Sequence, residues 1–241
     1  GRSVDLKKLK SITRKKKLAL IEDAAQNFGS NIGNKSACNI ADISCTSFFP
    51  TKNLGCFGDG GAIFTNNKKI AQKIKMLRNH GQKTYNNTNF VGLNSRLGSI
   101  QASILLEKLK KLKKKKILQK NTYNRYSKFF SSKNIKGFPE CRFSSKYYDD
   151  MNSHFSIIVK RRKLFIDYLK KYKLEYKIYY SKPLYKQFNY KKKIKLLNTE
   201  FICKNIISLP FNEFSKTRFN KTLNLLAKII DKDKGIFFEK K

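Results

Sequence analysis

The chain has 241 residues, and 40% of them are hydrophobic, which is enough apolar content to bury the core of one large or two modest domains. This composition excludes a disordered chain. Because no run of eighteen apolar residues occurs and no apolar segment of the secretory kind opens the sequence, we expect a cytoplasmic protein without a membrane span.

The charge is strongly unbalanced: 54 Lys and Arg residues face 16 Asp and Glu residues, for a formal net charge of +38. On its own, such a charge favours a nucleic-acid or anionic-membrane partner. The lysines, however, are spread along the whole chain, and Asn, Ile, Phe and Tyr are also abundant, a mixture typical of drift toward A/T-rich codons. Lysine runs such as 113–116 and 191–193 are typical of solvated faces. We therefore favour the compositional interpretation, from which only salt-sensitive, non-specific adhesion to RNA follows.

The five cysteines form no CxxC pair, and His80 and His154 are the only histidines that could help them to bind a metal. The sequence therefore predicts no metal site. An odd number of cysteines in an enzyme-like chain favours reduced, packed thiols.

The first predicted elements are a helix at residues 3–10 and a strand at 18–22. The apolar run 18–21 precedes two acidic residues, a pattern with which a buried parallel strand delivers a carboxylate to the end of a sheet. Asp23 would then lie at the strand tip and face a crevice.

A second strand, predicted at 45–49, leads into Lys52 and then into a glycine-rich turn at 58–61. A single lysine between an apolar turn and a glycine-rich run is typical of a cofactor lysine, whose amine binds an aldehyde and shuttles a proton. The glycines permit close approach to a phosphate, but they fit an ordinary hairpin turn before a strand at 62–65 equally well.

Residues 68–78 have the apolar spacing of an amphipathic helix, which ends at the loop residue His80. His80 either lines a substrate pocket or is simply an exposed loop residue.

The longest helical pattern starts at Gly98 and continues toward Tyr126, so we expect this helix to bridge two domains. Its predicted buried face carries five apolar residues: Ile100, Ile104, Leu105, Leu109 and Leu112. Asn94 and Arg96 lie just ahead of the helix, where its N-terminus favours anions such as phosphate. Asn94 also fits the role of a capping or turn residue.

After about residue 130, strands are predicted at 155–159 and 176–180, and helices at 163–172 and 216–230. Alternation of this kind predicts a small α/β domain.

Several of these segments, taken in order, resemble the DegT/DnrJ/EryC1/StrS family of sugar aminotransferases, which are pyridoxal-phosphate enzymes of fold type I. The matching segments are EDAAQNFG (22–29), TSFFPTKNLGCFGDGGAIFTN (46–66), RNHGQ (78–82) and GLNSRLGSIQASILLEKL (92–109).

The resemblance implies a role for five residues. Lys52 would be the Schiff-base lysine and Asp23 the partner of the pyridine nitrogen. Gln26 would contact the phenolic-oxygen side of the ring, and Ser47 would hydrogen-bond the cofactor phosphate. Asn94 would reach the phosphate of the neighbouring subunit's cofactor, which implies a homodimer with a shared active site. Since a dehydrating branch of the family carries histidine at the position of Lys52, lysine favours transamination.

The fold implied is α/β. Residues 1–125 would form the C-terminal part of the large cofactor-binding domain, with a mixed, mostly parallel sheet, and residues 126–241 a small C-terminal α/β domain. We find no segment that resembles the N-terminal third of the family fold, which supplies strands and part of the phosphate cradle. We therefore expect either a fragment of a longer protein or a truncated copy whose activity is impaired. Tyr179 and Tyr185 replace histidines that family members often carry.

The reaction implied is transamination of a nucleotide-linked keto sugar, with glutamate as the amino donor. The tract at residues 45–61 most resembles members that aminate the 3-keto position of a UDP-linked N-acetylated hexuronic acid. Two alternatives stay open: a non-catalytic remnant that only dimerises, and a basic protein that adheres to RNA or membranes on a degenerate enzyme scaffold.

Overall fold

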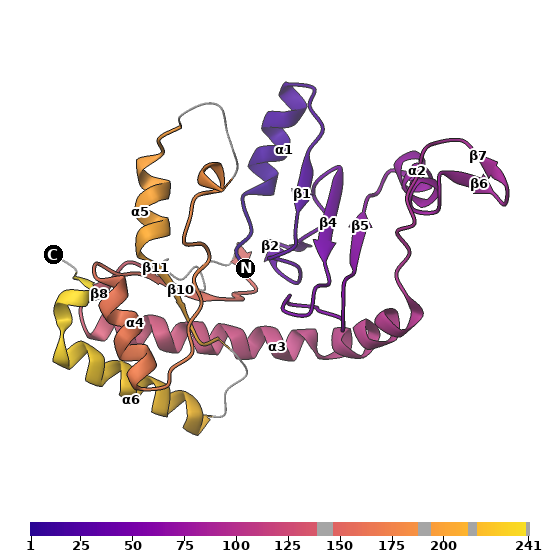
Figure 1. The fold of residues 1–241 in the computed structure, drawn as a ribbon. Coiled ribbons are helices and arrows are strands. Elements are labelled where there is room, and N and C mark those ends of the chain that lie inside the picture. Colours follow the sequence, from indigo (N-terminus) through magenta and orange to yellow (C-terminus); the bar gives the residue numbers. More distant parts are fainter. Residues whose placement is uncertain (139–146, 188–193, 212–215, 240–241) are drawn as a thin grey trace. The chain divides into compact units, whose positions relative to one another are not determined.

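The computed structural model describes residues 1–138, 147–187, 194–211 and 216–239 (Figure 1). The chain divides into two compact units. The first consists of Gly1–Ile117 and Arg142–Ser153, and the second of Leu118–Cys141 and His154–Lys241. The domain boundary expected after residue 125 stays a prediction. Cys141 and the lysine run at 191–193 lie outside the described residues.

A three-stranded sheet with the order β1-β4-β5 forms the centre of the first unit. β1 (Ile21–Asp23) runs parallel to β4 (Ile43–Ser47), and β4 is antiparallel to β5 (Gly61–Phe64), so the sheet is mixed, as expected. Because β1 and β4 are parallel, their carboxyl ends lie at the same edge of the sheet.

The expectation that residues 18–21 form a buried strand is wrong. β1 begins only at Ile21, and Leu18 and Ile21 are 62% and 66% exposed. In the described part of the chain β1 pairs with β4 alone, so its other edge lacks a neighbouring strand. The buried side chain of β1 is instead that of Glu22, which is 5% exposed.

The other elements of the first unit are short, apart from two helices. The predicted helix at 3–10 lies at Leu6–Lys15, capped by Asp5, whose carboxylate accepts from the Lys8 amide at 3.0 Å. The helix at 68–78 has the predicted bounds. The elements are α1 (Leu6–Lys15), β2 (Asn31–Ile32), β3 (Lys35–Ser36), α2 (Lys68–Arg78), β6 (Gln82–Thr84), β7 (Asn87–Thr88) and β9 (Tyr148–Asp149).

The long helix α3 extends over Ser99–Ser132, six residues beyond the predicted end. Its predicted buried face is wrong in part: Leu105 is 7% exposed, but Ile100 and Leu109 are 76% and 48% exposed. The buried face of α3 is therefore rotated relative to the apolar pattern of its sequence.

The second unit mixes helices with two pairs of antiparallel strands, β10 (Phe155–Ile158) with β11 (Ile206–Leu209) and β12 (Phe238–Glu239) with β8 (Ile135–Lys136). Aromatic rings fill its core, where the Tyr126 and Phe155 rings stack with centroids 4.8 Å apart and Phe219 packs edge-on against Tyr126 at 4.7 Å. Its elements are β8 (Ile135–Lys136), β10 (Phe155–Ile158), α4 (Arg162–Lys171), η1 (Leu184–Lys186), α5 (Leu197–Asn205), β11 (Ile206–Leu209), α6 (Lys216–Lys232), η2 (Lys234–Ile236) and β12 (Phe238–Glu239).

In this unit the predicted strand at 155–159 and the helices at 163–172 and 216–230 are confirmed within about two residues, as β10, α4 and α6. The predicted strand at 176–180 is wrong, because only Lys177 pairs there, in an isolated bridge with Ser208. α5 and β11 were not predicted.

Within the described ranges, none of the helices is long and apolar enough to cross a membrane. The same residues contain no group of three or more His, Cys, Asp or Glu side chains that could hold a metal ion. Cys38, Cys45, Cys56 and Cys203 carry free thiols.

Candidate functional site

The carboxyl ends of β1 and β4 bring two of the predicted site residues to one edge of the sheet. Asp23 is the last residue of β1, where it pairs with Cys45, and Ser47 is the last residue of β4. The Asp23 carboxylate is exposed, and one of its oxygens accepts from the Ala25 amide at 2.9 Å. The Ser47 hydroxyl accepts from the Phe49 amide at 3.2 Å, which leaves its own hydrogen available to a ligand.

Lys52 lies on a tight loop between β4 and the glycine-rich turn. The loop is closed at its base, where the Cys56 amide donates to the Phe48 carbonyl at 2.8 Å, and the Lys52 amide donates to the Phe49 carbonyl at 2.9 Å. At Gly55 a β-carbon would lie 2.6 Å from the carbonyl oxygens of Phe49 and Pro50, so only glycine fits.

Asn53 connects the loop of Lys52 to the turn that follows Asp23. Its side-chain amide nitrogen donates to the carbonyls of Gln26 and Phe28, at 3.1 and 3.4 Å. The side chain is 5% exposed, so these hydrogen bonds are shielded from water. Through Asn53, the segments that carry Asp23, Gln26 and Lys52 form one connected structure.

An apolar cluster packs the loop against α3. Phe48, Leu54 and Cys56 of the loop pack with Leu105 of α3, and the partly buried residues around them are Phe28, Ala62 and Leu112. The Lys52 side chain is half-buried, whereas Gln26 is exposed.

Asn94 lies on a different segment. Its backbone bridges to Asn79 at the end of α2, and the flanking amides of Leu93 and Ser95 donate to carbonyls of α2 at 2.8 and 2.9 Å. Asn94 is exposed, and in Figure 1 this part of the chain projects away from the three-stranded sheet. The structure thus connects the segments that carry four of the five predicted residues, but not that of Asn94, for which the resemblance implies a role in the neighbouring subunit. His80, in the same segment, is exposed.

Glu22 is a residue that the sequence analysis missed. Its carboxylate accepts from the Ser44 hydroxyl at 3.0 Å, the Cys38 amide at 2.9 Å and the Asn27 side chain at 3.3 Å. Burial, reinforced by the Glu22 charge, raises the pKa of the Cys38 thiol to about 12. The sequence did contain a signal for a buried acid at this position. Neighbouring residues of a strand point to opposite faces, so of the adjacent acids Glu22 and Asp23 one points inward.

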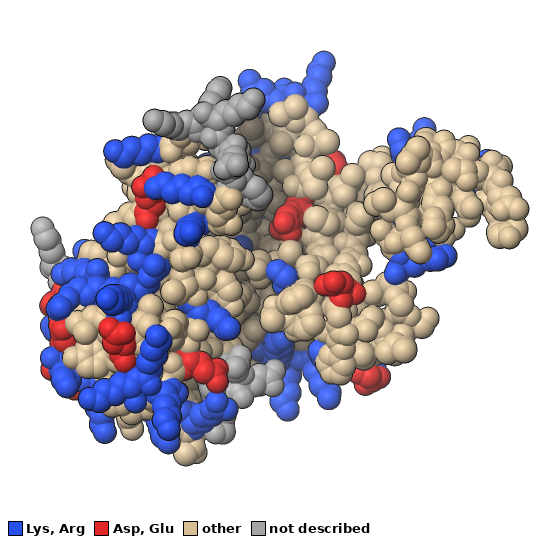
Figure 2. All heavy atoms as spheres, viewed as in Figure 1, with Lys and Arg blue, Asp and Glu red and all other residues tan. Residues whose placement is uncertain are grey.

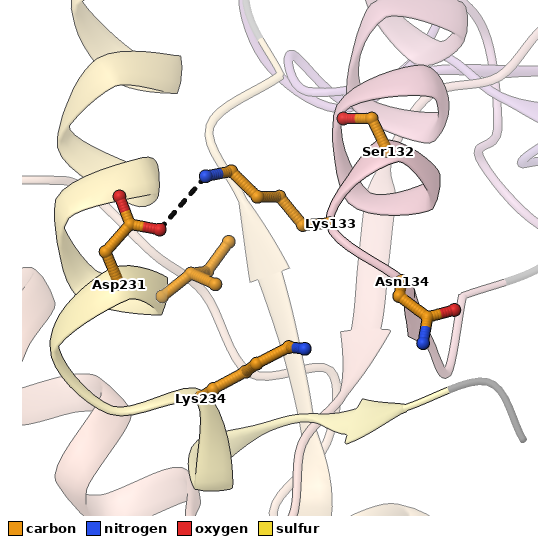
Figure 3. Close-up of a pocket in the computed structure, with 6 residues that line it drawn as sticks. Ser132, Lys133, Asn134, Asp231 and Lys234 are labelled. Atoms are coloured by element: carbon orange, nitrogen blue, oxygen red, sulfur yellow. Dashed lines mark hydrogen bonds and ion pairs between the residues drawn. The ribbon is translucent and has the colours of Figure 1, made fainter.

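A pocket in the second unit contains none of the predicted site residues (Figure 3). Lys133 and Asp231 close one side of it with an ion pair of 3.0 Å. The full lining is Ser132, Lys133, Asn134, Ile230, Asp231 and Lys234.

The donor set at the sheet edge suits pyridoxal phosphate. The Asp23 carboxylate can accept from a protonated ring nitrogen, the Ser47 hydroxyl can donate to a phosphate, and the Lys52 amine can bind an aldehyde. The residues present therefore fit this cofactor.

Comparison with known proteins supports this interpretation. A model of the DegT/DnrJ/EryC1/StrS aminotransferase family matches residues 1–219. UDP-2-acetamido-2-deoxy-3-oxo-D-glucuronate aminotransferase of Pseudomonas aeruginosa is 48% identical over 109 residues, which are 45% of this chain and 30% of that protein. dTDP-3-amino-3,6-dideoxy-alpha-D-galactopyranose transaminase of Aneurinibacillus thermoaerophilus is 34% identical over 219 residues, or 88% of this chain and 58% of that one.

The fold is also similar to solved structures. A DegT DnrJ EryC1 StrS aminotransferase from Brucella abortus superimposes with a TM-score of 0.85 at 30% identity, over 94% of this chain and 61% of that one. In each of these three cases the chain spans less than two thirds of the relative's length. The fold class is therefore that of the family, a mixed α/β aminotransferase fold.

Proposed function

Because the chain belongs to the DegT/DnrJ/EryC1/StrS aminotransferase family, we propose that it transfers an amino group to a nucleotide-linked keto sugar with the help of pyridoxal phosphate. The observation that carries this proposal is the connection at the sheet edge. The loop of Lys52 is tied through Asn53 to the turn after Asp23, while Ser47 ends the neighbouring parallel strand.

Bound pyridoxal phosphate supplies an electron sink for the reaction. Asp23 would hold the ring nitrogen in its protonated form, and Ser47 would fix the phosphate. Gln26 lies in the turn that Asn53 holds, which suits a contact with the phenolic-oxygen side of the ring. The Lys52 amine would hold the cofactor aldehyde and then accept and return a proton at the reacting carbon. The tight loop fixes the backbone of Lys52 and so restricts the positions that its amine can reach.

For the substrate, we propose a UDP-linked N-acetylated 3-keto hexuronic acid with glutamate as the amino donor. The support is the 48% identity to a UDP-sugar aminotransferase over 109 residues of this chain. The similarity to a dTDP-sugar transaminase makes dTDP-linked keto sugars the competing substrate class. Amination of matched UDP- and dTDP-linked keto sugars by the complete protein would distinguish the two.

We further propose a homodimer in which Asn94 acts on the cofactor of the second subunit. The support is a set of exposed apolar side chains in residues 85–109, the stretch of chain that contains Asn94, because clustered exposed apolar groups are typical of an interface between subunits. These side chains include Tyr85 (89%), Val91 (99%), Leu93 (70%), Ile100 (76%), Leu106 (62%) and Leu109 (48%). The cytoplasmic location stays a prediction.

Mapping of the lysine that captures the cofactor tests the proposal. The purified protein is titrated with pyridoxal phosphate near equimolar ratio, reduced with borohydride and digested, and labelled peptides are identified by mass spectrometry. We expect Lys52 to carry the label and Lys52→Arg, which keeps the charge, to abolish it. Labelling scattered over exposed lysines and unchanged in Lys52→Arg would falsify the assignment and favour a non-catalytic remnant.

A further inference from the structure

We propose that one face of α3 clamps the Lys52 loop and that Lys115 is a positioning residue for the Lys52 amine. This inference rests on the proposed function, because the position of Lys52 matters only if its amine captures the cofactor. The clamp consists of Gln101, Lys108 and Lys115.

The three clamp residues are spaced by seven, which is about 20° short of two full helical turns, so all three lie on one face of α3. Each makes a hydrogen bond to the backbone of the loop. Gln101 accepts from the Phe57 amide at 2.8 Å and donates to the Phe57 carbonyl at 3.0 Å. Lys108 donates to the Gly55 carbonyl at 2.6 Å, and Lys115 to the Asn53 carbonyl at 2.9 Å.

Apolar side chains lie between the clamp residues on the same face. Leu105 and Leu112, also seven residues apart, pack against Phe48, Leu54 and Cys56 of the loop. The face therefore alternates polar and apolar groups with the 4-3-4-3 spacing that helix packing requires. The leucines hold the loop's side chains, and the clamp residues satisfy its carbonyls.

Burial separates the clamp lysines from several neighbouring lysines of α3. Lys108 and Lys115 are half-buried, whereas Lys111, Lys113 and Lys114 are exposed. A lysine can lay its aliphatic stem on an apolar surface and deliver its ammonium group to an acceptor. The ammonium group of Lys108, which donates to the Gly55 carbonyl, also lies 4.6 Å from the centre of the Phe57 ring.

Lys115 acts on the residue that follows Lys52. It holds the Asn53 carbonyl, while the Asn53 side chain holds the Gln26 and Phe28 carbonyls. Asn53 is thus fixed on two sides, by α3 and by the turn after Asp23. Loss of the Lys115 contact would let the backbone next to Lys52 move without removing any group of the predicted site.

Lys115→Met tests the clamp, because methionine keeps an unbranched apolar stem but has no donor. Lys114→Met is the matched control, with the same charge change at an exposed neighbouring position. Hydrogen exchange is measured without cofactor at the Lys52, Cys56 and Phe57 amides, which are all hydrogen-bonded in the loop. The rate of borohydride-trapped labelling of Lys52 is measured on the same variants.

We expect Lys115→Met to raise loop exchange and to slow trapping at Lys52 by about tenfold each. Lys114→Met should match the parent, and Lys115→Arg, which restores a cationic donor, should recover most of the loss. Exchange in the second unit should not change.

Equal behaviour of Lys115→Met and Lys114→Met would overturn the clamp, and so would a rise in exchange throughout the chain or failure of Lys115→Met alone to fold. Gln101→Met removes both hydrogen bonds to Phe57, so hydrogen exchange in this variant tests the clamp at the other end of the loop. If the parent protein captures no cofactor at Lys52 while the exchange results follow expectation, the proposed function fails and the clamp remains.

Discussion

Replacement of Gly55 by alanine places a methyl group at the tightest point of the Lys52 loop. The new β-carbon would lie 2.6 Å from the carbonyl oxygens of both Phe49 and Pro50, whereas ordinary contact begins at 3.4 Å. Both obstructing atoms belong to the backbone, so no side chain can rotate away, and the loop must open by about 0.8 Å. Overpacking of this kind costs about 1–3 kcal/mol. For a chain of this size, each kcal/mol corresponds to roughly 2–4 °C in Tm.

Gly98→Ala is the control, because nothing lies within 4 Å of a β-carbon at that position. It should leave stability unchanged or raise it by about 0.4–1 kcal/mol through the unfolded chain. Urea unfolding of parent and variants gives the free energies, and borohydride trapping gives the labelling rate of Lys52, which should fall only in Gly55→Ala. A Gly55→Ala variant within about 0.5 kcal/mol of the parent, with normal trapping, would refute the steric reasoning.

Three other predictions follow from the buried carboxylate, its cysteine neighbour and the charge. Glu22→Leu leaves three donors without their acceptor and should cost about 2–4 kcal/mol in urea unfolding. The control Glu107→Leu changes an exposed acid and should leave the unfolding midpoint at that of the parent. Alkylation of Cys38, followed by mass spectrometry, should still accelerate as the pH rises above 9, because burial raises the pKa of this thiol; a plateau near pH 9 would contradict this. Since the folded thiol keeps its proton above the pH at which the unfolded thiol loses it, its contribution to stability falls as pH rises through that window. Binding to homopolymer RNA should be independent of base and should weaken steeply between about 50 and 200 mM salt; salt-resistant or base-specific binding would instead favour a dedicated RNA surface.

Elements with local signals were predicted well from the sequence. α2 has its predicted bounds because Asn67 caps it, accepting from the Lys69 and Ile70 amides, and because its apolar residues repeat with helical spacing. The family resemblance, drawn from the motifs around Asp23, Lys52 and Asn94, is confirmed by the match over residues 1–219. Motif order survives composition drift, since few residue types can replace a reactive lysine or a carboxylate.

Elements whose state depends on distant partners were predicted poorly. Residues 18–21 have the composition of a buried strand, but a central, buried strand has a neighbour on each side, and among the described strands β1 pairs with β4 alone. Residues 176–180 are rich in Tyr and Ile, yet Lys177 alone finds a pairing partner. Local composition carries no information about whether a sheet edge is available.

The buried face of α3 was mistaken for a related reason. A pattern search assigns leucine and isoleucine to the core and glutamine and lysine to solvent, so it selected Ile100 and Leu109 over Gln101 and Lys108. In the structure the loop opposite α3 directs backbone carbonyls toward the helix. Gln101 and Lys108 donate hydrogen bonds to two of them, which apolar side chains could not do. Helical periodicity predicts a helix, but it does not predict whether the surface that packs against the helix is apolar or presents hydrogen-bond acceptors.

Sequence patterns also fail to separate the solvated lysines of the run 113–116 from those that contact the protein. The run 113–116 was interpreted as a solvated face, and Lys113 and Lys114 are indeed exposed, but Lys115 and Lys116 are half-buried. Lys116 donates to the Gly29 carbonyl at 2.9 Å and pairs with Asp149 at 2.6 Å. Figure 2 shows that many other Lys and Arg side chains cover the visible face of the second unit.

If codon drift supplies lysines at random, most remain in solvent, and those that meet a backbone acceptor become structural. The distinction matters for any test of polyanion binding. Neutralising exposed lysines such as Lys113 and Lys114 removes charge alone, whereas neutralising Lys115 or Lys116 also removes a contact that holds the site's loops. Loss of RNA binding in the second kind of variant would therefore report on the fold as much as on the charge, and only the first kind measures how much of the +38 acts as a surface field.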